Sequence, residues 1–161
     1  MQPVSPRIVE LFNDALTFEL TVTNTYFLHA KMLESWGFPK LGKRFYDYSI
    51  DEMKDADELI ERILMFDGHP NVQRLNAITV GETAQEMLSL ALESEKLAVA
   101  TFNAAAKECH DLGDHGSAAV FEEMVRDEET HADWFESQLD AIERIGVENY
   151  LAGQLHGWPA R

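Results

Sequence analysis

Four long stretches of the sequence repeat their apolar residues with the 3.6-residue period of an α-helix, and no stretch keeps the strict alternation of a β-strand. Each stretch is about 27 to 30 residues long, which as a helix measures roughly 40 to 45 Å. Helices with one apolar stripe bury that stripe by packing against each other. The sequence therefore predicts an all-α protein built from four long helices.

Glycine, proline and capping residues mark where these helices begin and end. Ser5 followed by Pro6 is typical of a helix start, because serine accepts a hydrogen bond from a free amide and proline has no amide to leave unpaired. A glycine with a proline two residues later is a stop signal, and it occurs at Gly37 and again at Gly68. The predicted helices span residues 6–36, 41–68, 79–111 and 117–145, with a short terminal helix over 147–155.

The connection between the second and third helices is predicted to be long. Residues 69–81 fit neither period well, and Thr79 with Glu82 has the spacing of a capping box that opens the third helix. Two tight hairpins joined by one long crossover indicate a four-helix bundle of the crossover type rather than a plain up-down-up-down bundle. We expect residues 1–161 to form one domain without a linker.

The net charge of the chain limits the classes of partner that it is expected to bind. Thirteen Lys and Arg residues against 29 Asp and Glu residues give a formal net charge of −16, which argues against nucleic acid and anionic membrane surfaces and favours cations. No run approaches the roughly 18 apolar residues of a membrane span, and no apolar signal core is present at the N-terminus. Cys109 is the single cysteine, so no intramolecular disulfide is expected. We expect a soluble, cytoplasmic protein.

An acidic residue falls inside the apolar stripe of every helix, near its middle. A buried ionised carboxylate is costly unless it is paired or bound to a metal, and no Lys or Arg partner is evident in these stripes. Two divalent cations would supply four positive charges and take the carboxylate oxygens as ligands. The pattern predicts a dinuclear metal centre with the ligands Glu19, Glu52, Asp55, Glu95, Glu128 and His131.

Spacing within two of the helices supports this prediction. Glu52 and Asp55 are three residues apart, as are Glu128 and His131, so each pair lies on one helix face. The alternative for any single glutamate is a solvated position at the edge of the stripe, which is the more common case. Four helices that each place an acid at matched depth favour the metal centre over that alternative.

Five stretches make the chain resemble the bacterioferritin family over essentially its whole length. The resemblance implies a ferritin-like four-helix bundle with a short C-terminal fifth helix. It also implies two-fold dimers that assemble into a hollow shell of twenty-four subunits. The stretches are ELTVTNTYFLHA (19–30), SIDEMKDAD (49–57), IERIL (60–64), RDEETHADW (126–134) and GVENYL (146–151).

By this resemblance the acidic layer is a ferroxidase centre that holds two irons per subunit. Glu52 and Glu128 would bridge the irons, and Tyr26 matches a tyrosine beside the centre, although an ordinary core tyrosine is the alternative. The family has a histidine where this chain has Asp55. Because aspartate is shorter and adds a negative charge, we expect a site that favours retention of metal over rapid oxidation. The implied catalytic residues are Glu19, Tyr26, Glu52, Glu95, Glu128 and His131.

Met53 belongs to a different helix face from Glu52, because one residue corresponds to about 100° of rotation. Its face is too apolar for free solvent and indicates a subunit contact. A methionine on such a face more often packs than binds a ligand. The resemblance implies instead that two Met53 sulfurs, related by a two-fold axis, ligate one haem b in a pocket lined by Leu20, Asn24, Phe27 and Ile50.

The other polar residues give weaker indications of a functional site. Asp47 and Asp51 match the position of an inner-surface iron site in the family, although the family has a histidine at the position of Asp47. Five histidines have no partner at metal-ligand spacing and are predicted mostly at surface or cap positions: His29, His69, His110, His115 and His156.

Three functions fit these patterns. The first is an iron-storage subunit that oxidises ferrous iron with oxygen or peroxide and collects ferric mineral inside the shell. The second is a haem-carrying subunit with a weakly catalytic centre, in a shell shared with a second bacterioferritin subunit type. The third is a bundle that oxidises another substrate, against which the GVENYL end and the lack of an evident substrate pocket argue. The resemblance also implies a ferredoxin-like reductant as a partner.

Overall fold

A computed structural model describes residues 1–155 of the chain. Within that range the chain forms five α-helices and no β-strand, which confirms the predicted all-α class. None of these helices is both long and apolar enough to cross a membrane. The helices are α1 (Pro6–Ser35), α2 (Pro39–Met65), α3 (Ala84–Asp111), α4 (His115–Ile145) and α5 (Val147–Gln154).

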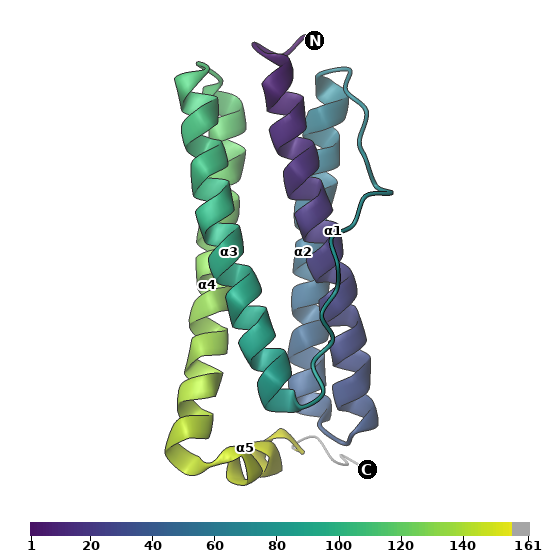
Figure 1. Ribbon diagram of the computed structural model, residues 1–161, viewed down its shortest axis with the longest axis vertical. Coiled ribbons are helices and arrows are strands. Elements are labelled where there is room, and N and C mark those ends of the chain that lie inside the picture. Colours follow the sequence, from purple (N-terminus) through teal and green to yellow (C-terminus); the bar gives the residue numbers. More distant parts are fainter. Residues whose placement is uncertain (156–161) are drawn as a thin grey trace.

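The four long helices run side by side as two antiparallel pairs, α1 with α2 and α3 with α4 (Figure 1). A tight turn joins the helices of each pair. The crossover between α2 and α3 runs back along the bundle, so α2 and α3 point in the same direction (Figure 1). The short helix α5 lies across the end of the bundle where α4 finishes. This is the predicted connectivity of two hairpins joined by one crossover.

The sequence explains how α1 begins and how the first two helices end. Ser5 Oγ accepts a hydrogen bond from an amide of the first turn of α1, and Gly37 takes a left-handed conformation after the helix, with φ of 89°. The predicted stop at Gly68 differs in detail, because the left-handed residue is Asp67, with φ of 57°. Gly68 is needed for space instead, since a Cβ there would lie 2.9 Å from the Ile63 side chain.

The helices α3 and α4 begin at other residues than predicted. Thr83 caps α3, four residues beyond the predicted Thr79, and its hydroxyl accepts a hydrogen bond from the Glu86 amide at 3.1 Å. The same Thr-x-x-Glu spacing occurs at both positions, and Thr79 remains in the crossover because the chain has to span the bundle before α3 can start. Asp114 caps α4, which therefore starts at His115 and not at residue 117.

The core consists of two apolar clusters with the acidic residues between them. On α1, Leu16 belongs to one cluster and Val22 to the other, and Glu19 lies between them. The apolar stripes predicted from the 3.6-residue period supply both clusters. Their largest buried side chains include Ile8, Phe12, Phe102 and Phe121 in one cluster and Tyr26, Phe45 and Phe135 in the other.

Hydrogen bonds fasten the crossover to α1. Arg74 Nε donates to Thr17 Oγ1 at 2.8 Å, and the Gly81 amide donates to His29 Nε2 at 3.0 Å. Because the crossover covers this side of α1, His29 is buried, and the prediction of a surface or cap position for it is wrong. Three other histidines are exposed as predicted, namely His69, His110 and His115, and His156 lies outside the described residues.

Candidate metal centre

A layer of acidic side chains crosses the middle of the bundle, with a contribution from each long helix. The helical period explains it, because each acid occupies a stripe position that would otherwise supply the apolar core. Five of the side chains are buried and Asp55 is half-buried. All six predicted ligands lie in this layer: Glu19 of α1, Glu52 and Asp55 of α2, Glu95 of α3, and Glu128 and His131 of α4.

These six side chains form two overlapping groups. In each group, one potential ligand atom per residue lies within 4.8 Å of the others. Glu52 and Glu128 belong to both groups, so the structure brings together two four-residue donor sets that share two carboxylates. The first set is Glu52, Glu95, Glu128 and His131, and the second is Glu19, Glu52, Asp55 and Glu128.

Several polar atoms of this layer are buried without a hydrogen-bond partner. They include both carboxylate oxygens of Glu19 and of Glu128. His131 Nδ1 lies 2.9 Å from Glu52 Oε1 and 3.6 Å from Glu128 Oε2. Buried polar groups without partners cost free energy and are rare in native structures. Carboxylate oxygens with one imidazole nitrogen are a donor set that suits divalent cations such as ferrous iron, so the residues present fit a pair of metal ions.

Burial and like charge disfavour the ionised form of most of these acids. Burial, reinforced by neighbouring carboxylates, raises the pKa of Glu19, Glu52 and Glu95, and it raises the pKa of Asp55 to about 8. Burial alone would raise the pKa of Glu128, but its interaction with His131 outweighs burial and lowers that pKa. Burial likewise opposes the charge of His131, whose carboxylate neighbours nevertheless raise its pKa to about 10. The layer therefore combines an imidazolium–carboxylate pair of His131 and Glu128 with four acids whose ionisation is disfavoured.

Aromatic rings pack against the acidic layer. The Tyr26 hydroxyl donates a hydrogen bond to Glu95 Oε1, and the Tyr26 ring packs 5.6 Å from the Phe45 ring, measured between centroids. The Tyr48 ring covers the imidazole of His131 with a centroid separation of 4.0 Å. These contacts fix the orientation of Glu95 and His131.

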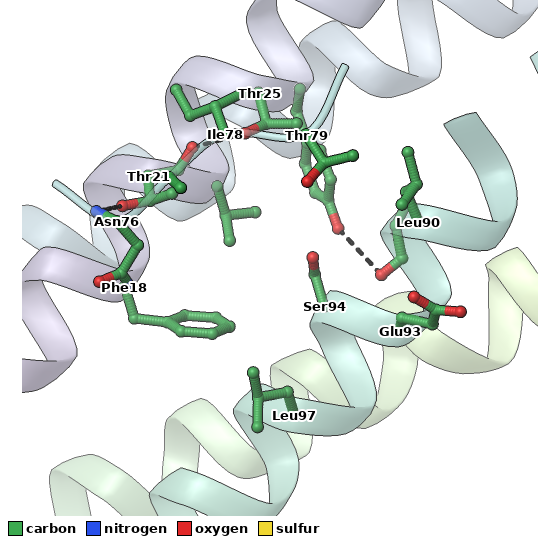
Figure 2. Close-up of a pocket in the computed structure, with 14 residues that line it drawn as sticks. Phe18, Thr21, Thr25, Asn76, Ile78, Thr79, Leu90, Glu93, Ser94 and Leu97 are labelled. Atoms are coloured by element: carbon green, nitrogen blue, oxygen red, sulfur yellow. Dashed lines mark hydrogen bonds between the residues drawn. The ribbon is translucent and has the colours of Figure 1, made fainter. Parts of the chain in front are cut away.

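A pocket of about 280 Å³ lies beside Tyr26, between α1, α3 and the crossover. Figure 2 shows Phe18 and Thr21 of α1 facing Leu97 and Ser94 of α3 across it. The crossover closes the pocket, and its Asn76 amide donates a hydrogen bond to the Thr21 hydroxyl at 3.0 Å (Figure 2). Apart from Glu93, its lining carries no ionised side chain. A pocket with a largely uncharged lining therefore lies next to Tyr26.

A second pocket, of about 410 Å³, lies between α2 and α4 and includes Asp55 and His131 of the centre. Asp51 and Asp127 line it as well, and Asp51 Oδ2 is 3.9 Å from His131 Nε2. Arg44 and Lys54 also line the pocket, and Lys54 lies 3.0 Å from Asp51, so its three acidic side chains are accompanied by two cationic ones. This pocket connects the acidic layer with the surface.

An exposed apolar face covers the outer side of α1 and α2. Met53 is 46% exposed and Phe27 47%, although both are large apolar residues. Ile50 and Tyr46 are also exposed, and the rings of Phe27 and Tyr46 lie 5.9 Å apart. An apolar patch of this kind is typical of an interaction surface.

The comparison with known proteins identifies the family. The ferritin-like domain family matches residues 9–145. The chain is 41% identical to a bacterioferritin of Brucella melitensis biotype 1, over 96% of this chain and 95% of that protein. It is 40% identical to one of Mycolicibacterium paratuberculosis (91% and 92% covered) and 37% identical to one of Rhodobacter capsulatus (89% of each). The chain belongs to the bacterioferritin family.

The other predicted site residues of this chain belong to α1 and α2. Of the predicted haem-pocket residues, Leu20 is half-buried and Asn24 is exposed. The Met53 thioether lies among exposed apolar side chains. This setting fits a haem, which is a flat apolar ring whose iron can bind methionine sulfur. Asp47 and Asp51 each lie close to a lysine of α2, Lys43 at 2.6 Å and Lys54 at 3.0 Å.

Sequence reasoning missed two groups that the structure brings to this bacterioferritin centre. Asp127 precedes a stripe residue and lies off the stripe, yet it is four residues before His131 and so shares its side of α4. Tyr48 has a core position on α2 and lies four residues before Glu52. The i, i+4 spacing to a ligand candidate is the signal that could have found both.

Proposed function

We propose that this chain is a subunit of an iron-storage protein that oxidises ferrous iron at the acidic layer and collects ferric mineral inside a hollow shell. One observation carries the proposal: two donor sets from four helices share Glu52 and Glu128, which is the arrangement two bridged irons require. The bacterioferritin relatives support the same function. We further propose that residues 1–161 act as one domain.

Ferrous iron is the substrate in this proposal. One iron takes Glu19 and Asp55, the other takes Glu95 and His131, and both share the bridging carboxylates. Acids that hold protons in the free centre release them as the irons bind. The negative charge of the resulting carboxylates then offsets the positive charge of the metal ions. Each iron gives up one electron. Two electrons and two protons convert one oxygen molecule to hydrogen peroxide, or one hydrogen peroxide to two waters.

The groups on the two sides of the centre have different roles in this proposal. The acidic pocket with Asp51 and Asp127 admits cations, aided by the net charge of −16. Tyr26 keeps Glu95 in place through its hydroxyl and can supply a proton or an electron on the other side.

The test is an anaerobic ferrous titration followed by stopped-flow oxidation, for the unaltered chain and for Glu128→Gln. Glu129→Gln is the matched control, because Glu129 is exposed and adjacent. We expect two irons per chain and at least tenfold slower oxidation in Glu128→Gln, since both irons lose a bridging charge. Oxidation in Glu128→Gln as fast as in the control would refute the catalytic centre.

Asp55 favours a second candidate function, a haem-carrying subunit with a weakly catalytic centre. Its carboxyl has a pKa of about 8 and keeps its proton at neutral pH, so one iron position binds less readily. Asp55→His in the same stopped-flow experiment separates the two functions. Fast oxidation in the unaltered chain supports the first. Slow oxidation that histidine restores supports the second, with a further subunit type doing the oxidation.

We also propose that two copies of the Met53 face would enclose one haem b, with one Met53 sulfur from each copy holding it. Haem supplies electron transfer when bound, and the chain's part is to hold it in an apolar pocket with Leu20, Asn24, Phe27 and Ile50. Met53→Leu should abolish the haem absorption band on reconstitution. Met65→Leu is the control, because Met65 is also an exposed methionine of α2. An unchanged band in Met53→Leu would remove that residue from the role.

Assembly completes the proposal. Two-fold dimers through this face would build the shell of twenty-four subunits, and a ferredoxin-like protein would deliver the electrons that release iron. Size-exclusion chromatography with light scattering measures the assembly, and a particle no larger than a dimer under all conditions would exclude storage inside a shell.

A further inference from the structure

The turn between α3 and α4 lies at the end of the bundle opposite α5 (Figure 1). Two exposed histidines meet at this turn, away from the acidic layer in the middle of the bundle. His110 is in the last turn of α3 and His115 is the first residue of α4. Gly113 takes a left-handed φ of 79° between them, which lets the chain reverse within three residues. The two Nδ1 atoms are 3.0 Å apart.

Glu122 determines which nitrogen of His110 carries a proton. It lies seven residues after His115, two turns along the same face of α4, and its Oε1 is 2.7 Å from His110 Nε2. A carboxylate only accepts hydrogen bonds, so Nε2 of His110 donates to it. In the neutral imidazole, Nδ1 of His110 then keeps its lone pair and accepts a hydrogen bond from Nδ1 of His115. A carboxylate behind the imidazole is also the usual arrangement for a histidine that binds a metal.

We propose that His110 and His115 form a surface site for a divalent transition metal ion that prefers imidazole, with Cu²⁺ as the strongest binder. Two ligands at about 2.0–2.1 Å from one metal are about 2.9 Å apart when their bonds are at right angles, and about 3.4 Å apart in a tetrahedron. The observed 3.0 Å lies within this range, so the pair can serve one metal ion, and among divalent first-row metals imidazole nitrogen binds Cu²⁺ most strongly. When the metal binds, the Nδ1 proton of His115 is released or moves to Nε2, and small rotations of the two exposed rings then point both Nδ1 lone pairs at one ion.

Neighbouring groups leave the remaining positions of the metal to water. Glu122 is engaged with His110, and Asp111 accepts a hydrogen bond from Lys107 at 2.5 Å. Both histidines are exposed, so the metal reaches them without passing through the bundle. The site is independent of the acidic layer, whose only imidazole among the described residues is that of His131.

Pulsed EPR with one equivalent of Cu²⁺ tests the proposal, because it counts the imidazoles on the metal. The acidic layer can offer one imidazole, whereas the surface site offers two. The variants are His110→Ala and His115→Ala, each in the full-length assembled protein. His69→Ala is the matched control, since His69 is an exposed histidine elsewhere on the chain, and circular dichroism checks that all variants remain helical.

We expect two imidazoles per Cu²⁺ in the unaltered chain and in His69→Ala. Each of the other two variants should show at most one, with at least tenfold weaker Cu²⁺ binding by competition titration. Glu122→Ala should keep both imidazoles but weaken binding several-fold, because His110 loses the carboxylate that orients it. One imidazole or none in the unaltered chain, or two imidazoles that persist in His115→Ala, would overturn the proposal.

Discussion

Replacing Asp55 with asparagine should remove about one of the protons that the centre releases when it binds metal at pH 7. Burial and two neighbouring carboxylates raise the pKa of Asp55 to about 8. At pH 7 a group with that pKa is about 90% protonated, at pH 8 about 50% and at pH 9 about 10%. A metal ligand has to be deprotonated, so Asp55 contributes about 0.9, 0.5 and 0.1 protons at these three values.

The direction in which metal affinity changes with pH follows from this proton release. The free centre binds protons that the loaded centre does not, so metal affinity rises with pH. Each proton released corresponds to a tenfold gain in affinity per pH unit. Glu19 and Glu95, whose pKa values burial also raises, release protons in both the unaltered chain and the variant. The difference between the two proteins therefore reports mainly on Asp55, with a smaller contribution from Glu19, whose pKa the neighbouring Asp55 also raises.

Titration calorimetry with Co²⁺ measures this difference, because the apparent enthalpy in buffers of different ionisation enthalpy gives the number of protons released. Co²⁺ avoids the oxidation that ferrous iron would undergo. Asp57→Asn is the matched control, since Asp57 is an exposed aspartate of α2 two residues away. Equal proton release in Asp55→Asn and the control at pH 7, or a difference that stays constant from pH 7 to pH 9, would refute the reasoning.

Three other predictions concern separate parts of the molecule. Tyr26→Phe removes the hydrogen bond to Glu95 and should slow ferrous oxidation about tenfold while two irons still bind, as measured by stopped flow and anaerobic titration. Gly42→Ala should destabilise the chain by about 1–3 kcal/mol in urea denaturation, because the new Cβ would lie 2.9 Å from the Ala30 carbonyl oxygen; Gly153→Ala, which meets nothing within 4 Å, should have little effect. Asp114→Ala removes the cap of α4 and should cost about 1–2 kcal/mol at neutral pH. Burial opposes the charge of Asp114, but hydrogen bonds with Ser117 and the charge of Arg62 lower its pKa below 3.8, so this contribution should disappear as the pH falls through that lower value, which denaturation at pH 2 to 7 would reveal.

The bundle and the acidic layer were predictable because both depend on one period. Glu19, Glu52, Glu95 and Glu128 occupy positions that the 3.6-residue repeat assigns to the core, and a residue in the core of one long helix must face the other helices. His131 and Asp55 follow from the spacing of three residues to a neighbour already assigned. No knowledge of loop structure is needed for these six positions.

What the sequence analysis missed depends on packing between segments that are distant in the chain. His29 is buried because the crossover lies over it, and no local pattern reports where a crossover will pass. Thr79 and Thr83 both precede a glutamate at capping distance, and only the length the crossover must span decides between them. His110 and His115 meet because one tight turn reverses the chain, whereas their spacing of five residues fits no single helix face.

Anomalous diffraction at the iron edge, from crystals soaked with ferrous iron without oxygen, tests the central claim most directly. The account predicts two iron positions per chain, both bound by Glu52 and Glu128. One should also contact Glu19 and Asp55, and the other Glu95 and His131. A single iron in the bundle, or two irons that do not share those carboxylates, would contradict it.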